Sequence, residues 1–297
     1  MNKKTLPLPL TQGRGVVTLV LLLFALSSYA QSDNDFGMDL SVGAEKKLSK
    51  AVSFGIEGNF RSQNNSKDVE RWSLGGAFDF RLVHTKRFDL KASAGWEYIW
   101  QNRLEGETTL HYDENTYITP SGAITVDELD GFNQTSDYWR NRHRTTVAFS
   151  GTYKPNKRWE FSLREAVQYN HYFGATQPRT KYRNDDLDDD ATIEEIMNDP
   201  DTEVYQDDKE IDSKDRFVLR SKLTIQYNIK HSIFSPFVSL DYGCGLNYTT
   251  NKWKVSAGTD IDLSKHHKLD VFYRFQTEDD DDEPNGHFLG VGYKFKF

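Results

Sequence analysis

The sequence predicts an all-β fold: a transmembrane antiparallel β-barrel of ten to twelve strands, with short periplasmic turns and long extracellular loops. Three features carry this prediction: apolar and polar residues alternate along segments of ten or more residues, short and long connections alternate, and the C-terminus is aromatic. A membrane barrel needs apolar side chains only at every second position, so its mean hydropathy stays low. A mean hydropathy of -0.72 and an aromatic content of 13% are therefore compatible with a barrel.

Residues 1–30 have the pattern of a secretory signal peptide. Three basic residues and no acidic one precede or flank an apolar run at residues 16–26, and Ser28-Tyr29-Ala30 is a small-x-small cleavage site. An uncleaved helical anchor is the alternative, but the run is well short of the roughly 20 residues that span a bilayer. We therefore expect export, cleavage near Ala30, and a mature chain of residues 31–297 in the outer membrane of a Gram-negative bacterium.

Eleven segments of the mature chain show the alternation that half-buried strands require. Leu219 and Leu223, for example, fall on one face of their segment, and Arg220 and Lys222 on the other. The segments lie at residues 37–48, 51–61, 71–82, 88–103, 138–153, 158–173, 215–228, 233–247, 252–263, 268–278 and 287–297. Bacterial barrels normally have an even number of strands. An odd count means that a strand is missed, that one is wrongly split, or that the N-terminal segment starts at the outer mouth.

The connections between these segments sort into two kinds. Short ones are expected at residues 49–50, 83–87, 154–157, 229–232 and 264–267, whereas residues 104–137 and 174–214 are long and polar. Short turns on one side and long loops on the other are typical of outer-membrane barrels. A soluble β-sandwich is the alternative, but its strands average about 5–6 residues.

Composition excludes several other classes of protein. Removing the signal peptide takes away three basic residues and no acidic one, which lowers the formal net charge from -8 to -11. So acidic a chain is not expected to bind nucleic acid. The single cysteine, Cys244, excludes an internal disulfide and a cysteine-rich metal site. We expect no metal and no cofactor.

The C-terminal residues are the sharpest local signal. Gly292, Tyr293, Phe295 and Phe297 resemble the assembly signal that the barrel-insertion machinery reads on outer-membrane proteins, with one departure at Gly290, where a polar residue is usual. The expected partners are therefore this machinery during assembly, and outer-membrane lipid and lipopolysaccharide afterwards.

Several segments, in their order along the chain, also resemble an uncharacterised family of Gram-negative outer-membrane proteins, domain of unknown function 2490. The matching pieces are residues 44–50 (AEKKLSK), 138–144 (YWRNRHR), 161–165 (FSLRE), 273–276 (YRFQ) and 290–295 (GVGYKF). The resemblance covers most of the mature chain and implies an outer-membrane protein. It implies no particular activity.

A set of arginines is the main candidate for binding. Arg140, Arg142 and Arg144 share one face of their segment, and Arg164 should lie across from them on the next segment, near the outer rim. Guanidinium groups bind phosphate and carboxylate in a bidentate manner, so this set could hold anions or lipopolysaccharide phosphates. The alternative is that these arginines pair with Glu97 or with an acidic loop.

An acidic extracellular loop is expected at about residues 183–215. Residues 185–215 carry fifteen carboxylates in thirty-one positions, and their spacing does not match a calcium-binding EF-hand loop. We expect a solvated loop with a short helical turn at residues 191–197, folded back over the mouth toward the arginines. Weak binding of divalent cations is the alternative.

Polar faces that carry both signs of charge predict a salt-bridged and mostly closed lumen rather than a wide porin. The chain is therefore expected to be a narrow channel or a surface structural protein. The alternative is a membrane-embedded hydrolase acting on lipid or peptide at the outer rim, where His111, His143, His171 and His287 fall. No catalytic motif accompanies these histidines, so no catalytic residue is assigned. The oligomeric state is left open.

The alternation generates a test of strand faces. A charge placed on a lipid-facing position near the midplane costs roughly 2–4 kcal/mol. Leu223→Arg should therefore destabilise the barrel far more than Thr224→Arg, which points into the lumen. Urea unfolding in lipid vesicles measures both variants, and equal destabilisation would contradict the assignment of faces.

Overall fold

The structure is a computed structural model that describes residues 35–119, 122–184, 187, 191–279 and 285–297. The predicted signal peptide lies outside these residues. The chain divides into two compact units, one of residues 1–99, 143–170 and 216–297, the other of residues 100–142 and 171–215. The two units are described separately below.

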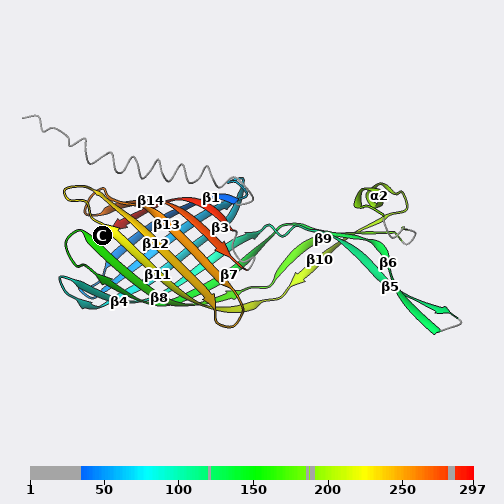
Figure 1. Cartoon of the computed structure of the whole chain (residues 1–297), viewed down its shortest axis with the longest axis horizontal. Coiled ribbons are helices and arrows are strands. Elements are labelled where there is room, and N and C mark those ends of the chain that lie inside the picture. The colour runs from blue at the N-terminus through cyan, green and yellow to red at the C-terminus, as the bar shows by residue number, and fades with distance from the viewer. Residues whose placement is uncertain (1–34, 120–121, 185–186, 188–190, 280–284) are drawn as a thin grey trace, which may run out of the picture. The chain divides into compact units, whose positions relative to one another are not determined.

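The first unit is built on a closed β-barrel of eleven strands (Figure 1). The strands are β1 (Asp35–Lys47), β2 (Val52–Gln63), β3 (Asp68–His84), β4 (Phe88–Arg103), β7 (Tyr138–Tyr153), β8 (Trp159–Tyr172), β11 (Lys214–Tyr227), β12 (Phe234–Gly245), β13 (Asn251–Asp262), β14 (His267–Glu278) and β15 (Gly286–Lys296). They match the eleven segments predicted from the alternation, within a few residues at each end. The prediction of an all-β barrel is confirmed.

The predicted faces of the strands are also confirmed. Leu219, Leu223 and Val255 are exposed on the outside of the barrel. Lys254, next to Val255, is buried inside it at 7% exposure. Because side chains alternate across a strand, the outward direction of Val255 and the inward direction of Lys254 give the direction of all the remaining side chains on β13. The interior is therefore polar and the exterior apolar.

The barrel closes in a way that the sequence did not predict. β1 pairs with β15 in parallel, in an unbroken register from Asp35 beside Gly286 to Glu45 beside Lys296. The pairs β1–β2 and β14–β15 are antiparallel. An odd number of strands requires one parallel pair at closure. Eleven strands fall within the predicted ten to twelve, and of the three readings of an odd count the structure supports the one in which the first strand starts at the end of the barrel opposite to the C-terminus. The start of β1 and the C-terminal residue consequently lie at opposite ends of the barrel (Figure 1).

The start of β1 is fastened to the neighbouring β2–β3 turn. Asn64, Asn65 and Ser66 in this turn all have positive φ, between 53° and 63°. Asparagine tolerates this region better than most residues. The carboxylate of Asp35 accepts hydrogen bonds from the backbone N–H groups of Asn64 and Asn65, at 2.7 and 2.6 Å. This turn is short, although it lies at the end of the barrel where long connections were expected.

The second unit contains a four-stranded sheet in the order β10-β9-β6-β5. Its elements are β5 (Thr108–Thr119), β6 (Gly122–Thr135), β9 (Ala175–Arg183), helix α2 (Ile193–Asn198) and β10 (Glu203–Ile211). These elements lie within residues 104–137 and 174–214, which the sequence predicted as long polar connections, and the strands inside these connections were not predicted. Among the described residues, no helix has the length and apolar character needed to cross a membrane.

Helix α2 is placed by its cap and by one buried side chain. Thr192 and Glu195 form a capping box, in which each side chain accepts a hydrogen bond from the other residue's backbone N–H. Ile196 is fully buried against Leu129 and Phe132 of β6. The short helix predicted at residues 191–197 is confirmed, and it covers the small apolar core of this unit.

The acidic segment pairs with basic side chains of its own sheet. Asp207 of β10 contacts the amino group of Lys181 at 2.7 Å and the guanidinium of Arg179 at 2.5 Å. Hydrogen bonds from Lys181 and Arg179 hold the pKa of Asp207 well below its usual range. Folding of this segment over a mouth stays a prediction.

The parallel pairing of β1 with β15, here called the seam, can be tested by cross-linking in a Cys244→Ser background. Val42 and Tyr293 are register partners, and both point outward. The pair Val42→Cys with Tyr293→Cys should react efficiently with a short bifunctional thiol reagent, measured by the mobility of the cross-linked chain. As a control, Phe36→Cys with Tyr293→Cys should not react, because about 20 Å of strand separates them. Equal reaction of both pairs, or of neither, would show that β1 does not close the barrel in this register.

Candidate functional site

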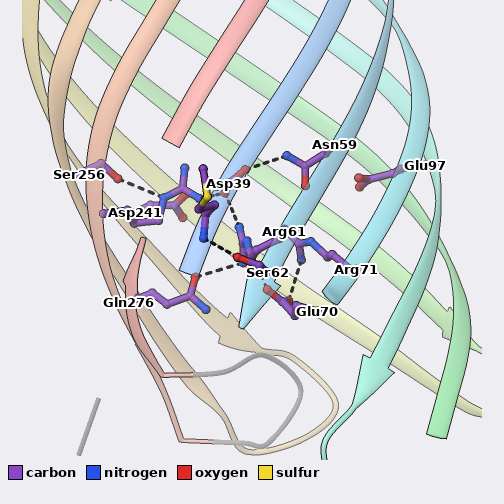
Figure 2. Close-up of polar contacts among 12 residues, drawn as sticks. Asp39, Asn59, Arg61, Ser62, Glu70, Arg71, Glu97, Asp241, Ser256 and Gln276 are labelled. Carbon is purple, nitrogen blue, oxygen red and sulfur yellow. Dashed lines mark hydrogen bonds and ion pairs between the residues drawn. The ribbon is translucent and has the colours of Figure 1, made fainter. Parts of the chain in front are cut away.

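A network of buried charges lines the lumen on the part of the wall that runs from β2 through β1 and β15 to β14 (Figure 2). Its centre is Asp39, which is 5% exposed. One carboxylate oxygen of Asp39 accepts hydrogen bonds from Arg61 at 2.8 Å and from Arg274 at 2.7 Å. The other oxygen accepts one from Asn59 at 2.8 Å. One anion thus binds two arginines, one from β2 and one from β14, which lie on either side of β1 in the barrel.

Further polar contacts extend this network along β3 and β14. The Nε of Arg61 lies 3.4 Å from Glu70, which is fully buried, and Arg71 lies 3.8 Å from the same carboxylate. Arg61 also donates a hydrogen bond to Gln276 at 3.4 Å. Figure 2 shows Arg61 between Asp39 and Glu70. Because a buried charge is costly unless it is paired, these contacts fix the side chains in place.

Two phenylalanines fill the lumen beside the network. Phe288 of β15 is fully buried, and the guanidinium of Arg61 lies 4.9 Å from the centre of its ring. The ring occupies the place that a side chain at Gly37 would need, since a Cβ there would lie 2.7 Å from it. Phe272 packs over Gly290 in the same way. The lumen is therefore narrowed along β14, β15 and β1.

A cavity of about 670 Å³ remains elsewhere in the barrel. Small residues of β2, β3 and β4 line part of it, including Gly55, Gly75 and Gly95. The charged residues that line it are Glu45, Glu57, Asp79, Glu97, Arg144, Arg164, Arg220, Lys222 and Lys294. All of these belong to the barrel unit. The cavity is thus polar and carries both signs of charge.

The acidic and the basic side chains of this cavity lie mostly on different groups of neighbouring strands, called here the acidic wall and the basic wall. The four acids belong to β1, β2, β3 and β4, which are consecutive in the barrel. Four of the five bases belong to β7, β8 and β11, which are also consecutive. The exception is Lys294 of β15, next to the acidic wall. One side of the cavity is therefore acidic and the other basic.

A second cavity of about 600 Å³ continues the first. Glu45 and Asp79 line both cavities. The second cavity reaches the β1–β2 turn at Ser49 and Lys50. Polar space therefore runs from the middle of the barrel to the end at which the C-terminus lies.

The four predicted arginines do not form one site. Arg142 donates a hydrogen bond to the Tyr172 hydroxyl at 2.5 Å, and Arg140 lies 5.4 Å from the centre of the same ring. Arg140 also donates to the backbone oxygens of Phe173 and Asp212, at 2.9 and 2.5 Å.

The other two predicted arginines line the 670 Å³ cavity. Arg144 bonds Glu97 at 3.3 Å, the alternative partner that the sequence suggested, and Asn170 at 2.9 Å. Arg164 lies on the same basic wall. The predicted set of four arginines thus separates into Arg140 and Arg142 around Tyr172, and Arg144 and Arg164 at the 670 Å³ cavity.

The predicted assembly signal lies on β15 and just after it. Gly292 pairs with Asp270 inside the barrel, and the hydroxyl of Tyr293 lies 2.6 Å from His267. Phe295 packs edge-on against Phe297, with ring centroids 4.5 Å apart. The backbone N–H of Phe297 bonds Glu45 of β1 at 2.9 Å. The terminal aromatic residue therefore completes the seam.

The rim histidines contact aromatic or acidic groups. His143 accepts a hydrogen bond from Trp96 at 3.3 Å, and His287 contacts the hydroxyl of Tyr273. His171 lies 2.7 Å from Asp215. These partners give no support to the alternative of a rim hydrolase.

One group in the second unit has the composition of a metal site. His111, Asp113 and Asp130 each offer a ligand atom, and these atoms lie within 4.8 Å of one another. The Nε of Arg183 lies 3.1 Å from Asp130 and already supplies positive charge there. The guanidinium therefore competes with any cation for this carboxylate.

The closed barrel and its charge-lined cavities define a class of protein with a polar interior and an apolar exterior. The chain belongs to the DUF2490 family, described as a protein of unknown function, whose model matches residues 36–287. This confirms the resemblance seen in the sequence. No curated protein matches the chain. One matching solved structure is described as the CymD monoaromatic hydrocarbon channel, with 11% identity, a TM-score of 0.28, and coverage of 82% of each chain.

The ion network generates a prediction of stability. Asp39→Asn keeps the shape of the side chain but leaves Arg61 and Arg274 without their shared anion. Breaking a buried pair in this way costs about 3–5 kcal/mol. Asp262→Asn is the matched control, because Asp262 pairs with Lys268 in an exposed position, where such pairs contribute about 0–1 kcal/mol. Urea unfolding of the refolded barrel measures both variants, and a loss no larger for Asp39→Asn than for the control would contradict the role of the network.

Proposed function

We propose that the protein spans the outer membrane and forms a narrow pore for small hydrophilic solutes. The observation that carries this proposal is the pair of joined polar cavities, of about 670 and 600 Å³, inside a closed barrel. A surface structural protein has no need for a hydrated, charge-lined interior of this size. The pore is therefore the better of the two functions expected from the sequence.

The outer surface supports membrane insertion. Large apolar side chains that are more than one-third exposed occur on every strand segment of the barrel wall from β1 to β4, among them Val42, Ile56, Trp72, Leu74, Phe78 and Trp96. A soluble protein rarely exposes so extensive an apolar surface. The signal sequence and the terminal aromatic residues favour the same location, with lipid and lipopolysaccharide around the barrel and the insertion machinery as the partner in assembly.

The expected pore is narrow. Barrels of about eight strands are filled by side chains, whereas those of 16–18 strands hold an aqueous channel. Eleven strands lie between these limits. Phe272, Phe288 and the Asp39 network further reduce the open cross-section. We therefore infer passage of small solutes only.

Conductance across a planar bilayer tests the proposal. The refolded barrel should give discrete current steps, because its polar lumen admits hydrated ions. Ser93→Trp should lower the step size severalfold, since Ser93 lines the larger cavity. Ala94→Trp is the matched control, because this neighbouring side chain points outward and should leave the steps unchanged. Folded protein that conducts no more than lipid alone, or equal effects of the two variants, would contradict a pore through this cavity.

A further inference from the structure

We infer that the 670 Å³ cavity is a binding site for small zwitterionic solutes that carry both an ammonium group and a carboxylate. This inference deepens the proposed function and rests on it, because the solute must reach the cavity from the surrounding water. It is argued from the charges on the two walls, their placement around the barrel, and the space between them.

The basic wall holds two cations that are available to a ligand. Arg144 is paired with Glu97, and Arg220 with Asp241. Among the described residues, by contrast, the side chains of Arg164 and Lys222 make no direct hydrogen bond or ion pair, although both line the cavity. Arginine binds a carboxylate through two parallel hydrogen bonds, and lysine adds a point charge. These two side chains therefore suit the carboxylate of a solute.

The acidic wall offers matching anions. Within the described part of the chain, the carboxylates of Glu57 and Asp79 likewise have no direct hydrogen bond or ion pair, and both line the cavity. Glu45 and Glu97 are engaged, with Lys296 at 4.0 Å and Arg144 at 3.3 Å. Glu57 and Asp79 are thus positioned to accept hydrogen bonds from an ammonium group.

The barrel keeps these opposite charges apart. β2, which carries Glu57, and β11, which carries Lys222, are five strand steps apart in one direction and six in the other. They are therefore on diametrically opposite walls. Asp79 of β3 and Arg164 of β8 are three steps apart, which at about 4.8 Å per step is roughly 14 Å along the wall. Neither pair forms a direct ion pair in the described part of the chain.

Small side chains leave room for a ligand between the walls. Gly55, Gly75 and Ala77 line the cavity on the acidic side, next to Glu57 and Asp79. Pockets for small molecules commonly have volumes of about 300–1,000 Å³. The cavity is within this range and can hold a small solute together with some water.

The separation of charge favours a dipolar solute over a simple ion. A simple anion is attracted by the basic wall and repelled by the acidic one, and a simple cation experiences the reverse. A zwitterion that lies across the lumen is attracted at both ends. Hydrogen bonds between ionised groups are also stronger than those between neutral groups, so the two ends contribute together.

Three solutes of similar shape provide the test. Glycylglycine carries both charges, N-acetylglycine carries only the carboxylate, and glycylglycinamide carries only the ammonium group. Calorimetry and NMR titration of the folded, detergent-solubilised full-length barrel measure binding without any need for conduction. Glycylglycine should bind at least tenfold more tightly than either of the others. Equal binding of N-acetylglycine would overturn the inference in favour of a plain anion site, and no binding of any solute would also overturn it.

Variants that remove the charges from one wall show which wall binds the carboxylate of the solute and which binds its ammonium group. Arg164→Gln with Lys222→Gln should abolish the preference for glycylglycine over glycylglycinamide. Glu57→Gln with Asp79→Asn should abolish its preference over N-acetylglycine. Lys209→Gln and Glu210→Gln are the matched controls, because both residues are exposed on β10 in the other unit. Controls that lose as much affinity as the cavity variants would overturn the assignment.

The outcomes also separate this inference from the proposed pore. Selective binding without conductance would contradict the pore and retain the binding site. Conductance with equal affinity for all three solutes would retain the pore and overturn the binding site. If the paired variants fail to fold, as judged by heat-modifiable mobility, the comparison of solutes on the unaltered protein still decides the inference.

Discussion

Closure of the hydrogen-bond ladder is the constraint on which the rest of the barrel depends. An open sheet edge exposes unpaired backbone N–H and C=O groups, and these cannot be satisfied in a hydrocarbon environment. β1 removes the edge by pairing with β15 along eleven register partners. Once the ring is closed, alternation sends every second side chain inward, so the polar residues of all eleven strands share one narrow space. The chemistry of the lumen follows from that confinement.

Register then decides which of the confined charges meet. Asp39 of β1 lies where Arg61 of β2, the next strand on one side, and Arg274 of β14, the second strand on the other side, reach the same carboxylate, and the resulting network is buried. Elsewhere in the lumen, most acids and bases fall on separate groups of strands, small residues lie on the acidic strands, and a cavity remains. The same residue types therefore yield a packed region and an open cavity. The difference is a matter of strand order, not of composition.

The strands and their faces could be predicted because these strands are long and alternate strictly between apolar and polar residues, as at Leu219 to Leu223. The parallel seam could not, because pairing between β1 and β15 depends on contacts between the two ends of the chain. The second unit was missed since β5 and β10 lack an apolar face that would mark them in the sequence. The four arginines share residue type and spacing, but the sequence does not contain the geometry that assigns Arg140 and Arg142 to Tyr172 and the other two to the cavity.

Because the strand number is odd, the first and last strands of this barrel run in the same direction. In a barrel of even strand number both chain ends emerge on the same side, so a short linker could join them and new ends could be opened at another turn. Here the first and last strands run in the same direction, and joining their ends would require a linker about as long as the barrel wall, roughly 36 Å for eleven residues. Such a linker would have to pass through the lumen or along the outer wall of the barrel. Circular permutation by a short linker between β1 and β15 is therefore excluded, and domains fused to the start of β1 and to the C-terminus would lie at opposite ends of the barrel.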